Sequence, residues 1–78
     1  MRFVWDEKKE RANQTEQGVS FELARLVFDD PHAISLRDDC KIKERWFTIG
    51  LVKVLVILLV VHTSENEDHD EIIRIISA

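Results

Sequence analysis

The first third of the chain carries a helical pattern that is mostly polar. Residues 7–17 are compatible with a helix, yet Ala12 is their only apolar residue, so we expect a surface helix that packs weakly. Asp6 is placed to cap its N-terminus, and Gly18 to end it in the left-handed conformation. A second helix is predicted over residues 21–28, where apolar residues recur at helical spacing.

The remainder of the chain shows the alternation and the β-branched runs that are typical of antiparallel strands. Strands are predicted over residues 33–37, 41–49, 54–63 and 71–77, and the weak alternation of residues 2–5 is compatible with a further short strand. Gly50 is the only good turn residue between the second and third of these strands, and residues 64–70 read as a solvated acidic loop. The prediction is one α+β domain over residues 1–78: two N-terminal helices followed by an antiparallel sheet of about four strands.

The predicted strand at 54–61 is apolar on both of its faces. Such a strand needs cover on both sides, and the two helices supply cover for only one. We therefore expect an uncovered apolar sheet face, and we hypothesise that a second subunit covers it in a homo-oligomer, most simply a dimer.

The composition of the chain excludes several classes of protein. The 78 residues are 45% apolar and 33% charged, a globular balance that excludes a wholly disordered chain. A net charge of −4 is not that of an obvious nucleic-acid-binding protein. Cys40 is the only cysteine, which excludes an internal disulfide and suits a reducing cytoplasm. The N-terminus has no signal-peptide pattern, and the run from Ile49 to Val61 contains Lys53 and is too short to span a bilayer.

Several kinds of catalytic or metal site find no support in the sequence. The histidines and carboxylates between residues 62 and 70 match neither zinc nor EF-hand spacing. Cys40 follows two aspartates, which disfavour its thiolate. With only Gly18 and Gly50, the chain has no glycine-rich phosphate loop. We therefore expect neither a metal nor a cofactor.

Two basic features remain as candidates for binding an anion. Lys41, Lys43 and Arg45 cluster around Glu44. Arg74 lies inside an isoleucine run, on a strand that is expected to be largely buried. A buried guanidinium needs either a carboxylate partner, for which Glu44 is a candidate, or an anion such as RNA phosphate, and both alternatives stay open. His62 ends the apolar strand, and a single histidine in that place is more typical of a strand end than of an acid–base group.

An ordered set of short motifs gives these residues a context. The motifs are Phe3-x-Trp5-Asp6, Gly18-Val19-Ser20-Phe21, Val27-Phe28-Asp29-Asp30-Pro31, Glu44-Arg45-x-x-x-Ile49-Gly50, Val60-Val61-His62-Thr63 and Ile73-Arg74-Ile75-Ile76-Ser77-Ala78. Together they resemble the BrnT family of bacterial toxins over essentially the whole chain.

The resemblance implies a RelE-like fold and a metal-independent endoribonuclease that arrests translation, neutralised by a DNA-binding, BrnA-like antitoxin. It implies that Arg45 and Arg74 contact the scissile phosphate and the transition state, with His62 or Glu44 as the acid–base group. The candidate RNA-binding residues are Lys8, Lys9, Lys41 and Lys43.

The chain departs from the family pattern in places that bear on activity. Glu16 and Gln17 stand where the family carries a Lys-His pair, and the basic helical tail that follows in the family is missing after Ala78. Two interpretations follow: a ribonuclease toxin weakened by loss of the tail, or a non-catalytic oligomeric or antitoxin-binding relative that keeps the fold. The neighbouring gene and a test for growth arrest discriminate between them.

Overall fold

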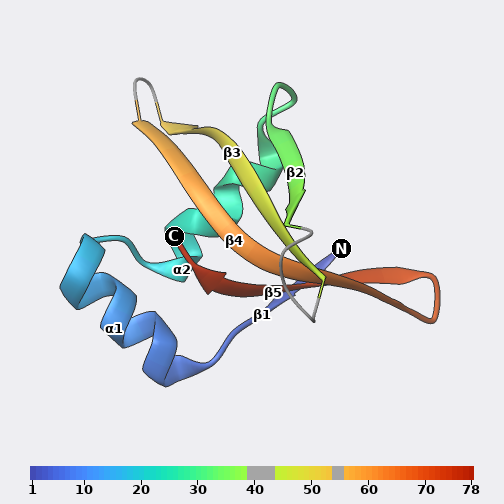
Figure 1. The fold of residues 1–78 in the computed structure, drawn as a ribbon, viewed down its shortest axis with the longest axis horizontal. Coiled ribbons are helices and arrows are strands. Elements are labelled where there is room, and N and C mark those ends of the chain that lie inside the picture. Colours follow the sequence, from blue (N-terminus) through green and yellow to red (C-terminus); the bar gives the residue numbers. More distant parts are fainter. Residues whose placement is uncertain (39–43, 54–55) are drawn as a thin grey trace.

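The computed structural model describes residues 1–38, 44–53 and 56–78. The elements are β1 (Arg2–Val4), α1 (Glu7–Gln17), α2 (Phe21–Ala24), the 3-10 helix η1 (Arg25–Asp29), β2 (Ile34–Asp38), β3 (Arg45–Lys53), β4 (Val56–Glu67) and β5 (Asp70–Ser77). The five described strands form one sheet in the order β1-β5-β4-β3-β2 (Figure 1). No helix among the described residues is long and apolar enough to cross a membrane.

The α+β class is confirmed, but the predicted strand count and order are wrong in detail. The described sheet has five strands rather than about four, and β1 precedes both helices. It pairs in parallel with β5, placing Phe3 beside Ile73, whereas the other neighbours are antiparallel. Parallel pairing needs a long connection, and the helices with β2–β4 provide it. A three-residue alternation carries no information about that distant partner.

Helix α1 begins and ends as predicted. The Asp6 carboxylate accepts hydrogen bonds from the backbone N–H groups of Lys8 (2.8 Å) and Lys9 (3.3 Å), and these bonds hold the pKa of Asp6 below its usual value. Gly18 closes the helix at φ 71°, a left-handed conformation that glycine adopts without strain.

Polar contacts attach α1 to the rest of the protein, because the helix has no apolar face. The Asn13 side-chain amide donates to the carbonyls of Val19 and Ala78 (2.9 Å each), and its oxygen accepts from the Ala78 N–H at 3.1 Å. Glu10 Oε2 also accepts from the backbone N–H of Phe21, the first residue of α2, at 3.2 Å. The periodic apolar pattern, which sequence analysis relies on, gives no sign of these contacts.

Replacing Asn13 with alanine is expected to lower the free energy of unfolding by about 2–3 kcal/mol, because three hydrogen bonds of a buried side chain are lost. Urea denaturation measures the change. The matched control is Gln17→Ala on the same helix, an exposed position expected to change stability by less than about 0.5 kcal/mol. Equal stability of the two variants would contradict this account of how α1 is anchored.

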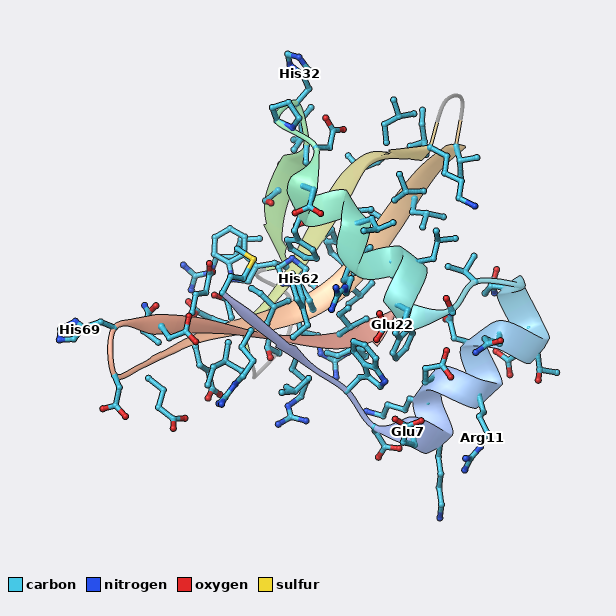
Figure 2. The ribbon with its side chains drawn as sticks, turned by 180° about the vertical axis from the view of Figure 1, so that it is seen from behind. Glu7, Arg11, Glu22, His32, His62 and His69 are labelled. Carbon is cyan, nitrogen blue, oxygen red and sulfur yellow. The ribbon has the colours of Figure 1, made fainter. Side chains whose placement is uncertain are left out.

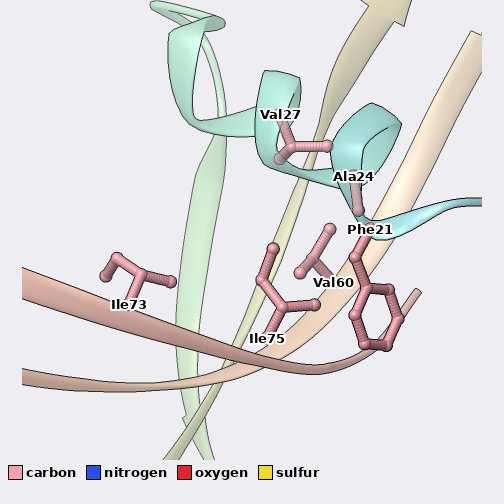
Figure 3. Close-up of a cluster of buried hydrophobic side chains, with 6 residues drawn as sticks. All are labelled: Phe21, Ala24, Val27, Val60, Ile73 and Ile75. Atoms are coloured by element: carbon pink, nitrogen blue, oxygen red, sulfur yellow. The ribbon is translucent and has the colours of Figure 1, made fainter. Parts of the chain in front are cut away.

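The apolar core lies between α2–η1 and one face of the sheet (Figure 3). Phe21, Ala24 and Val27 recur every three residues and are fully buried, as the helical spacing predicted. They pack against Val60 of β4 and the two core isoleucines of β5, Ile73 and Ile75. We refer to this side of the sheet as the helix face.

Gly50 is not the turn residue that the sequence suggested. It lies inside β3, which continues to Lys53, so the connection to β4 falls at residues 54–55, outside the described residues. A Cβ built on Gly50 would lie 3.0 Å from Val27 Cγ1 and 3.2 Å from both Ala33 Cβ and Asp30 Oδ2. The glycine is there because η1 and the loop after it approach β3 too closely for a side chain.

Asp30 fixes that close approach. Its Oδ2 accepts from the backbone N–H of Leu51 at 2.8 Å, and its Oδ1 accepts from the N–H of His32 at 2.9 Å. These two hydrogen bonds, the one from Leu51 first, lower the pKa of Asp30. The residue that ends η1 therefore also ties this loop to the strand beside Gly50.

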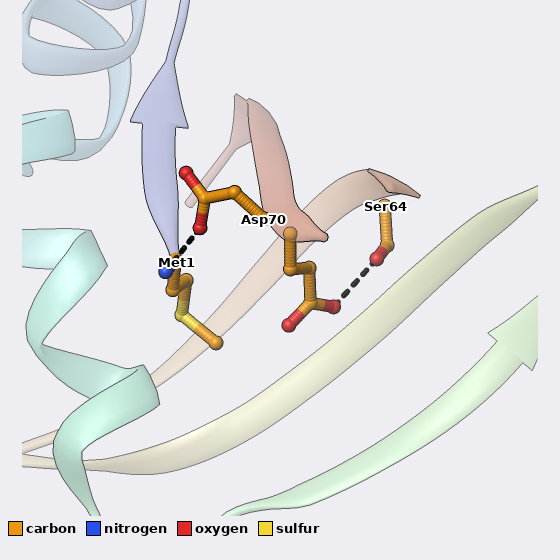
Figure 4. A network of polar contacts seen from close by, with 4 residues as sticks. Met1, Ser64 and Asp70 are labelled. Atoms are coloured by element: carbon orange, nitrogen blue, oxygen red, sulfur yellow. Dashed lines mark hydrogen bonds and ion pairs between the residues drawn. The ribbon is translucent and has the colours of Figure 1, made fainter. Parts of the chain in front are cut away.

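Residues 64–70 are not the acidic loop that was predicted. β4 continues to Glu67 and β5 starts at Asp70, with a two-residue turn at Asp68 and His69 (φ 50° and 66°). Two consecutive positive φ values mark the hairpin turn that matches strand twist, and its usual Asn-Gly signature is absent here. Met1 and Asp70 are joined beside this hairpin by an ion pair of 2.7 Å, and Ser64 donates to Glu71 across it at 2.6 Å (Figure 4).

In the described part of the chain, no helix covers the other face of the sheet, as the sequence predicted. Figure 1 looks onto this open face, with α2 and η1 behind the sheet. Alternation and register place six exposed aliphatic side chains on it, Ile34, Leu36, Ile49, Leu51, Ile57 and Leu59, each 41–65% exposed. We call these six residues the aliphatic patch.

Candidate functional site

Two arginines from separate strands lie in one row across the open face. Arg45 alternates with Phe47 and Ile49 on β3, and Arg74 lies on β5 opposite Thr63 of β4. The register that pairs Trp46 with His62 places Arg45 on the other side of Thr63. The two arginines are thus two strand spacings apart, about 10 Å at the backbone. Guanidinium groups on side chains of that length can converge on one phosphate.

The row borders a surface hollow of about 440 Å³. Its lining consists of Glu44, Thr63, Ser64, Glu65 and Arg74. It therefore combines a guanidinium, a hydroxyl from each of two residues and two carboxylates. In this hollow Arg74 can hold a phosphate group, and a carboxylate can accept a proton from a hydroxyl group.

Arg74 is exposed rather than buried, so the predicted largely buried environment is wrong. β5 buries only one of its faces, with Ile73 and Ile75 on the helix side, and Arg74 points to the open side. Glu44, the suggested partner, forms its ion pair with Arg37. Across the described residues, neither Arg45 nor Arg74 has a carboxylate within ion-pairing distance. Both guanidinium groups are therefore available to an anion from solution.

His62 lies on the helix face and does not meet the arginines. It is 4% exposed, and its Nε2 shares a 2.7 Å hydrogen bond with Thr48 Oγ1, which in turn bonds Ser35 Oγ at 2.7 Å. The Phe28 ring contacts the imidazole edge-on at 4.8 Å between centroids. Burial lowers the pKa of His62, although the Thr63 carbonyl and Glu71 oppose this shift. Figure 2 shows His62 in the middle of the molecule, with His32 and His69 at its periphery.

The buried histidine gives stability a dependence on pH. The unfolded chain protonates His62 near pH 6.5, whereas the folded chain does so at lower pH. The free energy of unfolding is therefore fully retained above about pH 6.5. It is expected to fall as pH drops below that value, by at most about 1.4 kcal/mol per pH unit. Urea denaturation between pH 7.5 and 5 measures this slope.

His62→Asn is expected to flatten that slope, with the exposed His69→Asn as the matched control that keeps it. An unchanged slope in His62→Asn would contradict the assignment. Comparing the two variants distinguishes the contribution of His62 to the pH dependence of stability from that of the carboxylates, which dominate the dependence only at lower pH.

The remaining predicted site residues lie elsewhere or outside the described part of the chain. Lys41 and Lys43 are outside the described residues. Lys8 and Lys9 are exposed in the first turn of α1, which follows β1, the strand beside Arg74. Among the described residues, no group of three or more histidine, cysteine or carboxylate side chains is arranged to hold a metal ion.

Thr63 and Glu65 also line the hollow, although neither was among the predicted site residues. Both lie on the open face of β4, at alternate positions that continue from Val61. The alternation past residue 63 was the available signal, but the density of acidic residues in 65–70 favoured the interpretation as a loop.

Known proteins resemble this chain in both sequence and fold. A family model described as the ribonuclease toxin BrnT of type II toxin–antitoxin systems matches residues 5–78. The crystal structure of the Brucella abortus ribonuclease toxin BrnT superposes with a TM-score of 0.69 at 22% identity, over 99% of this chain and 91% of that chain. A search of curated proteins finds no match. Because the family match spans nearly the whole chain, this protein belongs to the BrnT family of ribonuclease toxins of type II toxin–antitoxin systems.

Proposed function

We propose that the open-face row of Arg45, Thr63 and Arg74 is the RNA-cleaving site of this toxin, with RNA as its substrate. The observation that carries the proposal is the placement of two arginines in one row, neither having an ion-pair partner among the described residues. Two forked guanidinium groups can bind the non-bridging oxygens of one phosphate and stabilise the charge that develops on them.

Cleavage then uses the ribose 2′-hydroxyl as the nucleophile. The 2′-oxygen forms a bond to phosphorus while the bond from phosphorus to the 5′-oxygen breaks, which leaves a 2′,3′-cyclic phosphate and a 5′-hydroxyl. The proton of the 2′-hydroxyl passes to a carboxylate, and the departing 5′-oxygen takes a proton from water. None of these steps requires a metal ion.

Glu44 is the carboxylate that we assign to this proton transfer. It lines the same hollow as Arg74, and its Oε1 forms an ion pair with Arg37. His62 is not used in this proposal, because its imidazole is buried on the opposite face. Lys8 and Lys9, which are exposed on α1, would add attraction for the RNA backbone, and the charges of Lys41 and Lys43 would contribute to the same attraction.

The test is RNA cleavage by the purified chain in buffer containing EDTA. Glu44→Gln is expected to slow cleavage by at least about 100-fold. Glu7→Gln, an exposed carboxylate in the first turn of α1 (Figure 2), is the matched control and is expected to keep the wild-type rate.

Two other outcomes would redirect the assignment. If Glu65→Gln greatly slows RNA cleavage and Glu44→Gln does not, the proton acceptor is Glu65, the second carboxylate of the hollow. Absence of cleavage in the wild-type chain, free of any antitoxin, would instead support the non-catalytic, antitoxin-binding alternative. Membership of the family implies an antitoxin partner, and we propose that this partner is BrnA-like.

A further inference from the structure

The aliphatic patch has enough area for two copies of this chain to associate through it. Its six residues expose roughly 600 Å², the upper end of what the largest apolar patch of a typical monomer exposes. Two such patches facing each other remove roughly 1,200 Å² from water, which reaches the lower end of the standard size for a specific interface. A dimer therefore needs no other surface of the chain to become stable.

The charges beside the patch determine how two copies can meet. Asp38, at the end of β2, is the cross-strand neighbour of Arg45 on the open face. The arginine row therefore has a carboxylate at its β2 end and Arg74 at its β5 end. Lys53 lies at the opposite end of β3. A second copy turned end over end would place its Lys53 against the two arginines, which is unfavourable.

A two-fold axis that runs along the strands, between β3 and β4, matches both the apolar and the charged positions. It places β2 of one copy opposite β5 of the other, and β3 opposite β4. In the apolar part of the face, Ile49 then meets Leu59 of the second copy. In the arginine row, Asp38 meets Arg74 of the second copy, and the symmetry supplies this pair of opposite charges twice.

We propose that this chain forms a two-fold dimer in which the open faces of two copies pack against each other as two aligned sheets. The dimer covers the aliphatic patch and encloses the arginine row. It therefore excludes RNA from that row, a consequence that rests on the proposed function. In the absence of other partners, the toxin is active as a monomer and inactive as a dimer, and its concentration sets the balance between the two.

Sedimentation velocity on the chain without antitoxin, over roughly 1 to 200 µM, measures the assembly, and a monomer–dimer equilibrium is expected. Ile57→Ser is expected to raise the dissociation constant of the dimer at least about 100-fold, because each dimer buries this exposed side chain twice. Val56→Ser is the matched control, because Val56 adjoins Ile57 on β4 but points to the other face. It is expected to keep the wild-type Kd.

A double-mutant cycle tests the orientation of the two copies. Asp38→Asn and Arg74→Gln are each expected to weaken the dimer about tenfold, because either change removes one charge from both pairs. The double variant is expected to be no weaker than the weaker of the two single variants, since the same pairs are already lost. Losses that multiply in the double variant overturn the proposed two-fold arrangement.

RNA cleavage per chain, measured over the same concentrations, tests whether the dimer closes the site. The wild type is expected to lose specific activity as the dimer forms, whereas Ile57→Ser keeps its specific activity. A wild-type chain that stays monomeric throughout, or Ile57→Ser that dimerises as the wild type does, overturns the inference. A dimer that cleaves RNA as fast as the monomer overturns the closure of the site. Absence of cleavage at every concentration overturns the proposed function instead, because sedimentation detects the dimer without RNA.

Discussion

Replacing Arg74 with alanine is expected to abolish growth arrest in a bacterial host and to slow RNA cleavage by about 10²–10³-fold. The reason is that one of the two guanidinium groups facing the developing phosphate charge is removed. Arg74 is exposed and has no ion pair among the described residues. Its loss should therefore leave the free energy of unfolding within about 0.5 kcal/mol of the wild-type value. Single-turnover cleavage and urea denaturation measure the two quantities separately.

Two further variants make the Arg74 result specific. Arg74→Lys retains the charge but not the forked geometry, so it is expected to recover only part of the lost rate. Arg11→Ala removes an exposed cation from α1, away from the row (Figure 2), and should cleave RNA as the wild type does. Cleavage at the wild-type rate by Arg74→Ala would rule out the open-face site, whatever the other variants do.

The parts of the fold that the sequence predicted correctly are those whose signals are local. Asp6 and Gly18 cap the two ends of α1 through interactions within a few residues. The spacing of Phe21, Ala24 and Val27 defines one buried stripe. The open face was also predictable, because it needs only a count of what is available to cover an apolar strand. The parallel pairing of β1 with β5 connects residues about 70 positions apart, and nothing in three residues encodes that partner.

The same difference between local and long-range signals applies to the candidate site. Alternation correctly placed Arg45 on the face of β3 that carries Phe47 and Ile49, and Arg74 opposite its neighbouring isoleucines. Glu44 precedes β3, so strand alternation does not place it; it lines the hollow beside Arg74. Whether His62 shares a face with the arginines depends on register between strands, which a single sequence does not specify. The family resemblance implied that His62, Arg45 and Arg74 act in one site. The structure instead places the histidine on the helix face and the two arginines on the open face.

Gly50 provides the second large expected effect, this time on stability. Gly50→Val is expected to lower the free energy of unfolding by about 3 kcal/mol, despite the higher strand propensity of valine. The reason is steric: even a Cβ would lie 3.0 Å from Val27 Cγ1, and the Cγ atoms of valine have less room still. Urea denaturation followed by circular dichroism measures the loss.

A double-mutant cycle between Gly50→Ala and Val27→Ala tests whether Gly50 is needed because Val27 packs closely against it or because the backbone there requires a glycine. If packing against η1 is the cause, Val27→Ala opens the space that Gly50→Ala needs, and the double variant should be at least about 1 kcal/mol more stable than the sum of the single changes predicts. If Gly50 were instead needed for a turn, truncating Val27 would relieve nothing and the two losses would add. Additive losses would thus contradict the close approach of η1 to β3, the contact that places the helical layer on one face and leaves the arginine row open on the other.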